Sequence, residues 1–266
     1  MGFNWRNLNQ RSWTVCKEDK PLLSWILNAK NTADQKLKVG AFDKSQLRCG
    51  GTWFVGTNFL ENDASGQVNG VSLEGVAIEA IIEQYGDLFR KWDQAQISIC
   101  YEGYPKASHE DTPASFAFRK NNFGAHVDGI LPIGYPKRRY AKEYYAFILG
   151  IPLVNFNEFA APVVVWEGSH RIIRTFLSRV MMKNTFNSWD NLDITEIYQE
   201  ARKQVLSKCK KKIIHVPLGG SYILHRLAVH GIMPWGKKGE SENDGRMVAY
   251  FRPVLKNSKF WLNAEL

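Results

Sequence analysis

The chain has 266 residues, of which 44% are hydrophobic and 13% aromatic, and it carries a net charge of +9. This length fits one large domain or two small ones, and the composition supports a packed core and excludes an intrinsically disordered chain. No apolar run approaches the roughly 18 residues of a membrane span. The four cysteines include no Cys-x-x-Cys pair, which argues against a zinc ribbon or a dithiol redox motif.

Charge and cysteine use also bear on partners and location. The stretch MGFNWRNLNQRSW (residues 1–13) has no apolar core typical of a secretory signal, and scattered cysteines suit free thiols in a reducing compartment, so we expect a cytoplasmic protein. The positive charge is dispersed, and its densest points are 135–142 and 208–212. We therefore expect neither a nucleic acid nor a membrane as partner, while the 135–142 run could face an anionic substrate.

The N-terminal residues 1–94 mix loops and helices, and apolar residues at helical spacing predict a helix within 71–92. A second helix, an insertion near 190–212, begins with acids and ends with lysines, as the helix dipole favours. Otherwise the chain after residue 95 consists of short apolar or alternating runs separated by Gly, Pro and Asn. These predicted strands are 96–103, 115–121, 124–130, 144–153, 161–168, 211–218, 220–231 and 246–253.

Many short strands at such spacing predict a β-sandwich or barrel. No repeat, low-complexity tract or linker divides the chain, so a single domain over 1–266 is expected, with a helix- and loop-rich layer at 1–94 and a β-core at 95–266. The predicted class is mainly β with flanking helices, for which a jelly roll is one natural solution.

Two strong polar side chains lie two residues apart in the stretch FGAHVDGI (123–130). In a strand, His126 and Asp128 project from the same face and Val127 from the other. One imidazole and one carboxylate make two thirds of a 2-His-1-carboxylate metal site. The alternative interpretation is an ordinary polar end of a surface strand.

A metal site begun by this pair needs a third ligand from a distant segment. The remaining histidines are His109, His170, His215, His225 and His230, two of them in GGSYILHRLAVHGIMPW (219–235). In the following strand, Arg246 and Arg252 share a face with Val248 and Tyr250. An arginine on a buried strand needs a partner, and a dicarboxylate would satisfy its guanidinium.

Four segments in order resemble a known family. AHVDG, AAPVVVWEGSHR (160–171), LHRLAVHG (224–231) and GRMVAYFRP (245–253) are similar to the motifs of the phytanoyl-CoA dioxygenase-like branch of the Fe(II)/2-oxoglutarate oxygenases. The resemblance covers roughly residues 95–253. It implies a double-stranded β-helix, the jelly roll, with His126, Asp128 and His230 as iron ligands and Arg246 binding the distal carboxylate of 2-oxoglutarate.

The implied reaction uses Fe(II), 2-oxoglutarate and O2, releases succinate and CO2, and oxidises a C–H bond of a small molecule. Related halogenases lack the ligand carboxylate, so Asp128 favours hydroxylation. The chain departs from the family at Ile232, where a small hydroxyl residue often helps to bind the cosubstrate. It also has a longer interval between His230 and Arg246, which the charged stretch GKKGESEND (236–244) explains as a surface excursion.

Several assignments keep a rival. His225 rivals His230 as distal ligand, but a separation of five residues places the two on opposite faces of a regular strand. Arg252 rivals Arg246 for the cosubstrate. Arg119 and Lys120, on the predicted strand before His126, are candidates for a second cosubstrate or substrate contact. His170, His109 and His215 are expected to be structural or surface residues.

Two other functions remain open at this stage. One is a jelly-roll binding protein with a vestigial metal site. The other keeps the oxygenase chemistry but acts on nucleic acid or protein, which would require a contiguous basic groove at the iron.

Overall fold

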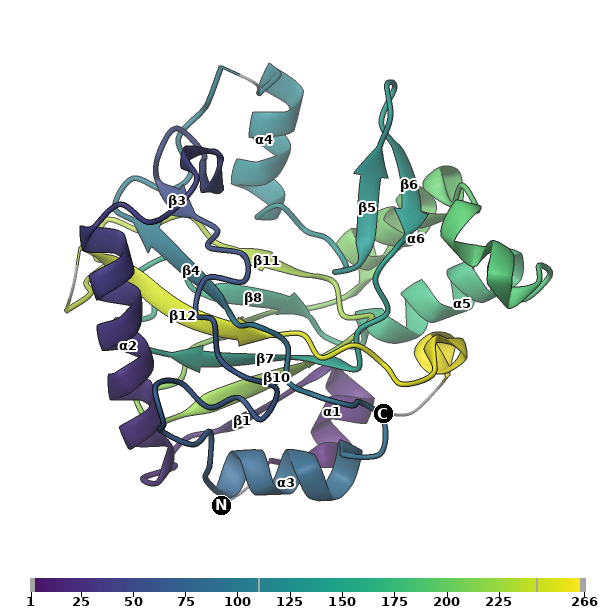
Figure 1. Ribbon diagram of the computed structural model, residues 1–266. Coiled ribbons are helices and arrows are strands. Elements are labelled where there is room, and N and C mark those ends of the chain that lie inside the picture. The colour runs from purple at the N-terminus through teal and green to yellow at the C-terminus, as the bar shows by residue number, and fades with distance from the viewer. Residues whose placement is uncertain (1–2, 110, 243, 264–266) are drawn as a thin grey trace.

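A large antiparallel sheet forms the body of the protein in the computed structural model, which describes residues 3–109, 111–242 and 244–263 (Figure 1). Its strand order is β1-β10-β7-β12-β4-β3-β2. The strands are β1 (Trp13–Cys16), β10 (Ser221–His225), β7 (Phe147–Pro152), β12 (Gly245–Phe251), β4 (Gln96–Tyr101), β3 (Trp53–Phe54) and β2 (Leu47–Arg48).

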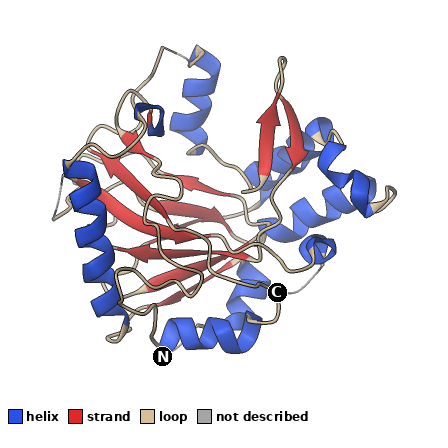
Figure 2. Cartoon of the chain, viewed as in Figure 1, coloured by secondary structure: helices blue, strands red, loops and turns tan. Residues whose placement is uncertain are grey.

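A smaller sheet faces the large one. It contains β11 (His230–Ile232), β8 (Val163–Trp166) and β9 (Lys211–Ile214), while β5 (Ile130–Ile133) and β6 (Arg138–Ala141) form a separate hairpin (Figure 2). One buried apolar cluster joins the two sheets, with Ile148, Val165 and Val248 among its members. Two sheets that enclose a shared core make a jelly roll, so the predicted fold class is confirmed.

Helices flank this β-core (Figure 1). They are α1 (Trp5–Arg11), α2 (Leu22–Lys38), α3 (Val76–Tyr85), α4 (Pro113–Asn122), α5 (Ser169–Met181) and α6 (Thr195–Lys208), with short 3-10 helices at Lys44–Gln46, Phe186–Asn191 and Ser258–Leu262. Within the described residues, none of the helices has the length and hydrophobicity that a membrane crossing requires.

Strand β12 separates two environments, as its alternation predicts. Phe251 packs against Trp25 of α2, with ring centroids 5.7 Å apart. Val248 and Tyr250 point the other way, into the cluster between the sheets. Arg246 and Arg252 share that second face, so both arginines project toward the interior of the jelly roll.

The predicted helices are present but shorter, at 76–85 and 195–208, whereas the strand predicted at 115–121 is wrong. That segment belongs to α4. Thr112 caps the helix by accepting a hydrogen bond at its Oγ from the backbone N–H of Ser115, and Pro113 occupies the first helical position. These are helix-start signals, and they prevail over the alternating phenylalanines that suggested a strand.

Two further features were not predicted. Residues 1–94 contribute three strands, β1, β2 and β3, to the large sheet. Helix α5 begins directly after Gly168, whose φ of 72° turns the chain from β8 into the helix. Glycine adopts this left-handed conformation without strain, so the Gly-Ser-His motif is a strand-to-helix turn.

Buried histidines fasten this turn to the N-terminal segment. The Nδ1 atom of His170 lies 2.9 Å from the hydroxyl of Ser12, and its Nε2 lies 3.0 Å from the carbonyl oxygen of Asn9. The His225 ring packs 4.5 Å from His170, and its Nδ1 accepts a hydrogen bond from the backbone N–H of Leu227. Both histidines therefore have structural roles, in line with the sequence interpretation.

Burial lowers the pKa of His170 to about 4, and that of His225 well below its ordinary value. The unfolded chain takes up a proton on His170 below about pH 6.5, whereas the folded protein does so only near pH 4, so stability falls as the pH drops through this window. Between pH 7 and pH 5 we expect His170 alone to cost about 2 kcal/mol of unfolding free energy.

Urea unfolding of wild type and His170→Gln at both pH values measures this contribution. The wild type should lose about 2 kcal/mol more than the variant on going from pH 7 to pH 5. Parallel losses in the two proteins would contradict the assignment.

Candidate metal centre

His126 and His230 come together through direct backbone pairing. The N–H of each residue donates to the carbonyl oxygen of the other over 3.0 Å, and their rings lie 4.6 Å apart. Pairing at His126 is an isolated bridge, so the strand predicted over 124–130 is reduced to this contact and the start of β5. Asp128 lies on the side of the histidines, and Val127 is buried, as expected.

Glycines allow neighbouring backbone to approach both ligand segments. Gly129 follows Asp128 with a φ of 82°, and a Cβ added there would overlap the carbonyl oxygen of Glu143. A Cβ at Gly231 would likewise overlap the carbonyl oxygen of Phe123. The close packing of the segments that carry the ligands therefore requires glycine at both positions.

Three ligand atoms converge at the centre. Oδ1 of Asp128 lies 3.0 Å from Nε2 of His126 and 3.6 Å from Nε2 of His230, and all the ligand atoms fall within 4.8 Å of one another. Nδ1 of His126 lies 2.9 Å from the carbonyl oxygen of Gly124, and Nδ1 of His230 lies 3.0 Å from that of Ala228. Each Nδ1 can donate its proton there, which leaves both Nε2 lone pairs available to a metal ion.

Electrostatics favour the metal-binding protonation states. Burial by itself raises the pKa of Asp128, but the Arg252 guanidinium and the two histidines outweigh it and hold that pKa well below its usual range. Burial lowers the pKa of His230 to about 4. At neutral pH the site thus contains a carboxylate and a neutral imidazole, the forms that coordinate metal ions. The side chain of His126 is 46% exposed, so the centre is open on this side.

Arg252 pairs with the ligand carboxylate and does not lie free for a cosubstrate. Its Nε donates to Oδ2 of Asp128 over 2.5 Å, and its Nη1 donates to Oε1 of Gln96 over 2.7 Å. Its backbone N–H donates to Asp93. The pair leaves Oδ1 of Asp128 directed at the two histidines.

Arg246 is buried between the sheets without a carboxylate partner. It is 1% exposed, and its Nη2 donates to the hydroxyl of Tyr250 over 2.9 Å. The hydroxyl of Tyr222 donates to the same oxygen over 2.7 Å. Among the described residues, no hydrogen-bond acceptor meets Nε or Nη1 of Arg246. A buried guanidinium with two unpaired N–H groups fits an organic carboxylate, which accepts such pairs bidentately.

Arg119 and Lys120 lie on α4, so their placement on a strand beside His126 is wrong. The Nη1 atom of Arg119 is 2.9 Å from each carboxylate oxygen of Asp111, and Lys120 is exposed. The structure does not bring either residue of α4 into the ligand cluster.

Sequence reasoning missed the two tyrosines beside Arg246. Tyr250 lies on the same face of β12 as Arg246, and the alternation of residues along that strand could have identified it. Tyr222 comes from β10, and no local pattern identifies it. Its ring packs against Gly150 of β7, where a side chain would leave no room. His215 lies outside the centre, where its Nε2 is 2.7 Å from the carbonyl oxygen of Phe156.

No protein-family model and no curated protein matches the chain. Among solved structures it is similar to the non-haem α-ketoglutarate-dependent carbocyclase SnoK from nogalamycin biosynthesis, with a TM-score of 0.50 and 11% identity over 93% of this chain and 82% of that chain. The non-haem α-ketoglutarate-dependent epimerase SnoN from the same biosynthesis gives 0.50 and 10%, over 93% and 80% of the two chains. At these identities the likeness establishes the fold, which is the jelly roll expected from the sequence.

Removal of the Arg252 guanidinium should weaken metal binding. Arg252→Met leaves Oδ2 of Asp128 unpaired, and loss of such a supporting contact typically lowers metal affinity about 10- to 100-fold. Arg252→Lys keeps the charge and should fall between this variant and wild type. Titration of the apo-protein with Co(II) measures the dissociation constants.

Arg246→Met is the matched control, because Arg246 contacts none of the three ligands. It should bind Co(II) like wild type. Equal Co(II) affinities for wild type and Arg252→Met would show that the ion pair does not support the ligand.

Proposed function

We propose that this protein is a non-haem Fe(II)/2-oxoglutarate-dependent dioxygenase that hydroxylates a small molecule. The observation that carries the proposal is the convergence of Nε2 of His126, Nε2 of His230 and Oδ1 of Asp128, with their second atoms already engaged elsewhere. A 2-His-1-carboxylate set suits Fe(II) and leaves coordination positions for a cosubstrate and O2. The buried Arg246 adds a site for a dicarboxylate.

Iron, when bound with 2-oxoglutarate and O2, supplies the oxidising chemistry, in which the cosubstrate becomes succinate and CO2 and a substrate C–H becomes C–OH. The protein residues bind and orient the reactants. His126, Asp128 and His230 hold the metal ion, and Arg252 fixes the carboxylate. Burial of Asp128 and His230 excludes water from one side, and the exposed side of His126 admits the substrate.

Arg246 would bind the distal carboxylate of 2-oxoglutarate through Nε and Nη1. Tyr250 would assist, because its oxygen already accepts hydrogen bonds from Arg246 and Tyr222 and its own proton is left to donate. The hydroxyl that Ile232 cannot provide would thus come from Tyr250, on the same strand face as Arg246.

We also propose the family branch, the type of reaction and the cellular location of the protein. The four motifs support the phytanoyl-CoA dioxygenase-like branch, and the presence of Asp128 supports hydroxylation over halogenation. The described cysteines form no disulfide with one another, which supports a cytoplasmic location. A vestigial metal site is disfavoured, because all three ligands and the buried Arg246 are in place.

Anaerobic reconstitution with Fe(II) and 2-oxoglutarate tests the proposal directly. We expect the weak visible charge-transfer band of the chelate in wild type, no band in His126→Ala, and a weakened band in Arg246→Ala at limiting cosubstrate. Addition of O2 should then release succinate. No band in clean, iron-loaded wild type would refute the oxygenase assignment.

Thermodynamic linkage gives an independent test of Arg246. In Mn(II)-loaded protein, 2-oxoglutarate at 100 times its dissociation constant should stabilise wild type against urea by about 2.7 kcal/mol. Arg246→Met should gain less than about 1 kcal/mol at the same concentration, because it loses the bidentate partner. Without 2-oxoglutarate, this variant should be at least as stable as wild type, because it lacks an unpaired buried cation.

Arg179→Met, on the exposed side of α5, is the control and should retain the full stabilisation by 2-oxoglutarate. Equal stabilisation of wild type and Arg246→Met would place the cosubstrate elsewhere.

A further inference from the structure

Within the described part of the chain, the segment that carries His126 and Asp128 has a strand neighbour on one edge only. His126 pairs with His230 of β11, and in an antiparallel pair the N–H and C=O of the flanking residues point to the opposite edge. Here these outward groups belong to Ala125 and Val127, which are both buried. Because buried backbone groups need hydrogen-bond partners, something other than a strand has to complete this edge.

Helix α6 supplies the partners through two side chains one turn apart. The hydroxyl of Tyr198 accepts a hydrogen bond from the backbone N–H of Val127 over 3.0 Å. Nη1 of Arg202 donates to the carbonyl oxygen of Ala125 over 3.3 Å. Residues i and i+4 of a helix lie on the same face, so a single face of α6 meets two of the four outward groups, the N–H of Val127 and the C=O of Ala125, while the N–H of Ala125 donates to the carbonyl oxygen of Asn122.

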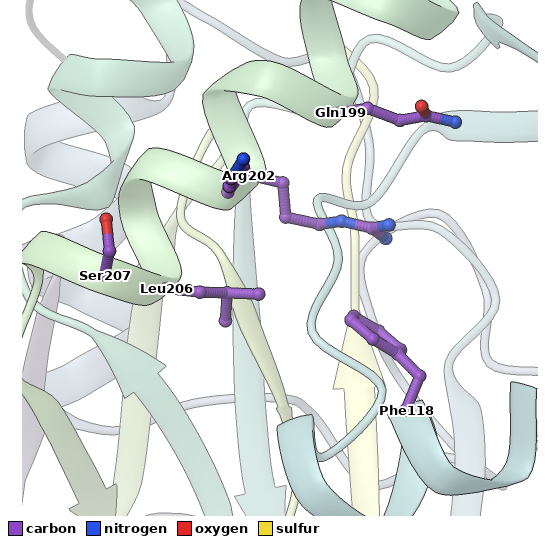
Figure 3. Close-up of a pocket in the computed structure, with 6 residues that line it drawn as sticks. Phe118, Gln199, Arg202, Leu206 and Ser207 are labelled. Carbon is purple, nitrogen blue, oxygen red and sulfur yellow. The ribbon is translucent and has the colours of Figure 1, made fainter. Parts of the chain in front are cut away.

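Both side chains are themselves held in place. Tyr198 is 1% exposed. The Arg202 guanidinium lies 4.8 Å from the ring of Phe118 on α4 and 5.5 Å from the ring of Tyr198. Figure 3 shows Arg202 extending from α6 toward Phe118, in a pocket of about 360 Å³ between the two helices.

The start of α6 is also fixed to the β5–β6 hairpin. Thr195 accepts a hydrogen bond at its Oγ from the backbone N–H of Arg139 over 2.7 Å, and Arg138 pairs with Asp193 and Glu196 over 2.6 Å each. These contacts fix the start of α6 to the hairpin that directly follows the ligand segment, so α6 is held to this part of the chain at a second point beyond Tyr198 and Arg202.

We propose that Tyr198 and Arg202 are positioning residues for the metal centre, which makes α6 a substitute for the missing edge strand of the ligand segment. They touch neither the metal ion nor a reactant, and they act through the backbone on both sides of His126. This inference rests on the proposed metal site. It gives α6, which the sequence suggested to be an insertion that ends with lysines, a role in positioning the ligands.

The test compares Tyr198→Phe with a matched control, Tyr144→Phe. Tyr144 is also buried, and its hydroxyl hydrogen-bonds the carbonyl oxygen of Ala141 and the carboxylate of Asp190, not the backbone on either side of His126. Arg202→Met is compared with Arg171→Met, since Arg171 likewise donates to a backbone carbonyl, that of Asn9, over 3.2 Å. Co(II) affinity and the visible spectrum of the Co(II) form are measured for the apo-protein of each variant, together with urea stability.

We expect Tyr198→Phe to weaken Co(II) binding about tenfold and to shift the Co(II) spectrum, because a ligand segment with a loose edge holds the two side chains less precisely. Arg202→Met should change both in the same direction but less, since its hydrogen bond is longer. The two controls should keep wild-type affinity and spectrum, even where they lose stability.

Equal Co(II) affinity and spectrum in Tyr198→Phe and Tyr144→Phe would overturn the positioning role and leave Tyr198 a structural residue. Failure of wild type to bind Co(II) at all would instead refute the metal site on which the inference rests, so the two failures are distinguishable.

Discussion

The reciprocal backbone pairing of His126 with His230 is the contact on which the centre depends. It joins the loop after α4 to β11 and sets the two imidazoles 4.6 Å apart, with Asp128 beside them. Backbone hydrogen bonds fix a strand register, and a slip of one residue in the segment that carries His126 and Asp128 would turn both side chains away from His230. The glycines at 129 and 231, the α6 side chains and the Nδ1 hydrogen bonds all serve to keep this one register.

Two buried arginines on one face of β12 differ in the partners that their guanidinium groups find. Arg252 is matched by Asp128, and the pair is supported by Gln96. Among the described residues Arg246 has the hydroxyl of Tyr250, aromatic neighbours and the thiol of Cys100 beside it, but no carboxylate. An unpaired buried cation costs stability in the ligand-free protein. Such a local cost is expected where the fold keeps a binding site ready for an anionic ligand.

The helices are more than a covering layer for this jelly roll. Helix α2 packs on the outer side of β12, through Trp25 and Phe251, while α6 completes the edge of the ligand segment. Helix α5, which starts at the Gly-Ser-His turn, is tied to the N-terminal segment through His170. Helices α2 and α6 therefore support a strand or segment that borders the centre.

Much of this arrangement follows from local sequence. Alternation in 246–253 predicts which residues of β12 face inward, and the period of two in His-Val-Asp predicts that His126 and Asp128 share a side. Both patterns depend only on strand geometry. The limits of such local patterns appear at 115–121, where alternating phenylalanines suggested a strand and the capping of Thr112 and Pro113 instead forms α4.

Only the tertiary structure decided which distant groups meet. It distinguished the two arginines, because Arg252 pairs with Asp128 and Arg246 does not. It packed His225 against His170 and not in the centre. It also placed Tyr222 beside Tyr250, and Tyr198 beside Val127, which are far apart in the chain. Sequence spacing constrains a side chain to a face of its own element. The partner across a sheet or helix interface is set by long-range packing, which no local period encodes.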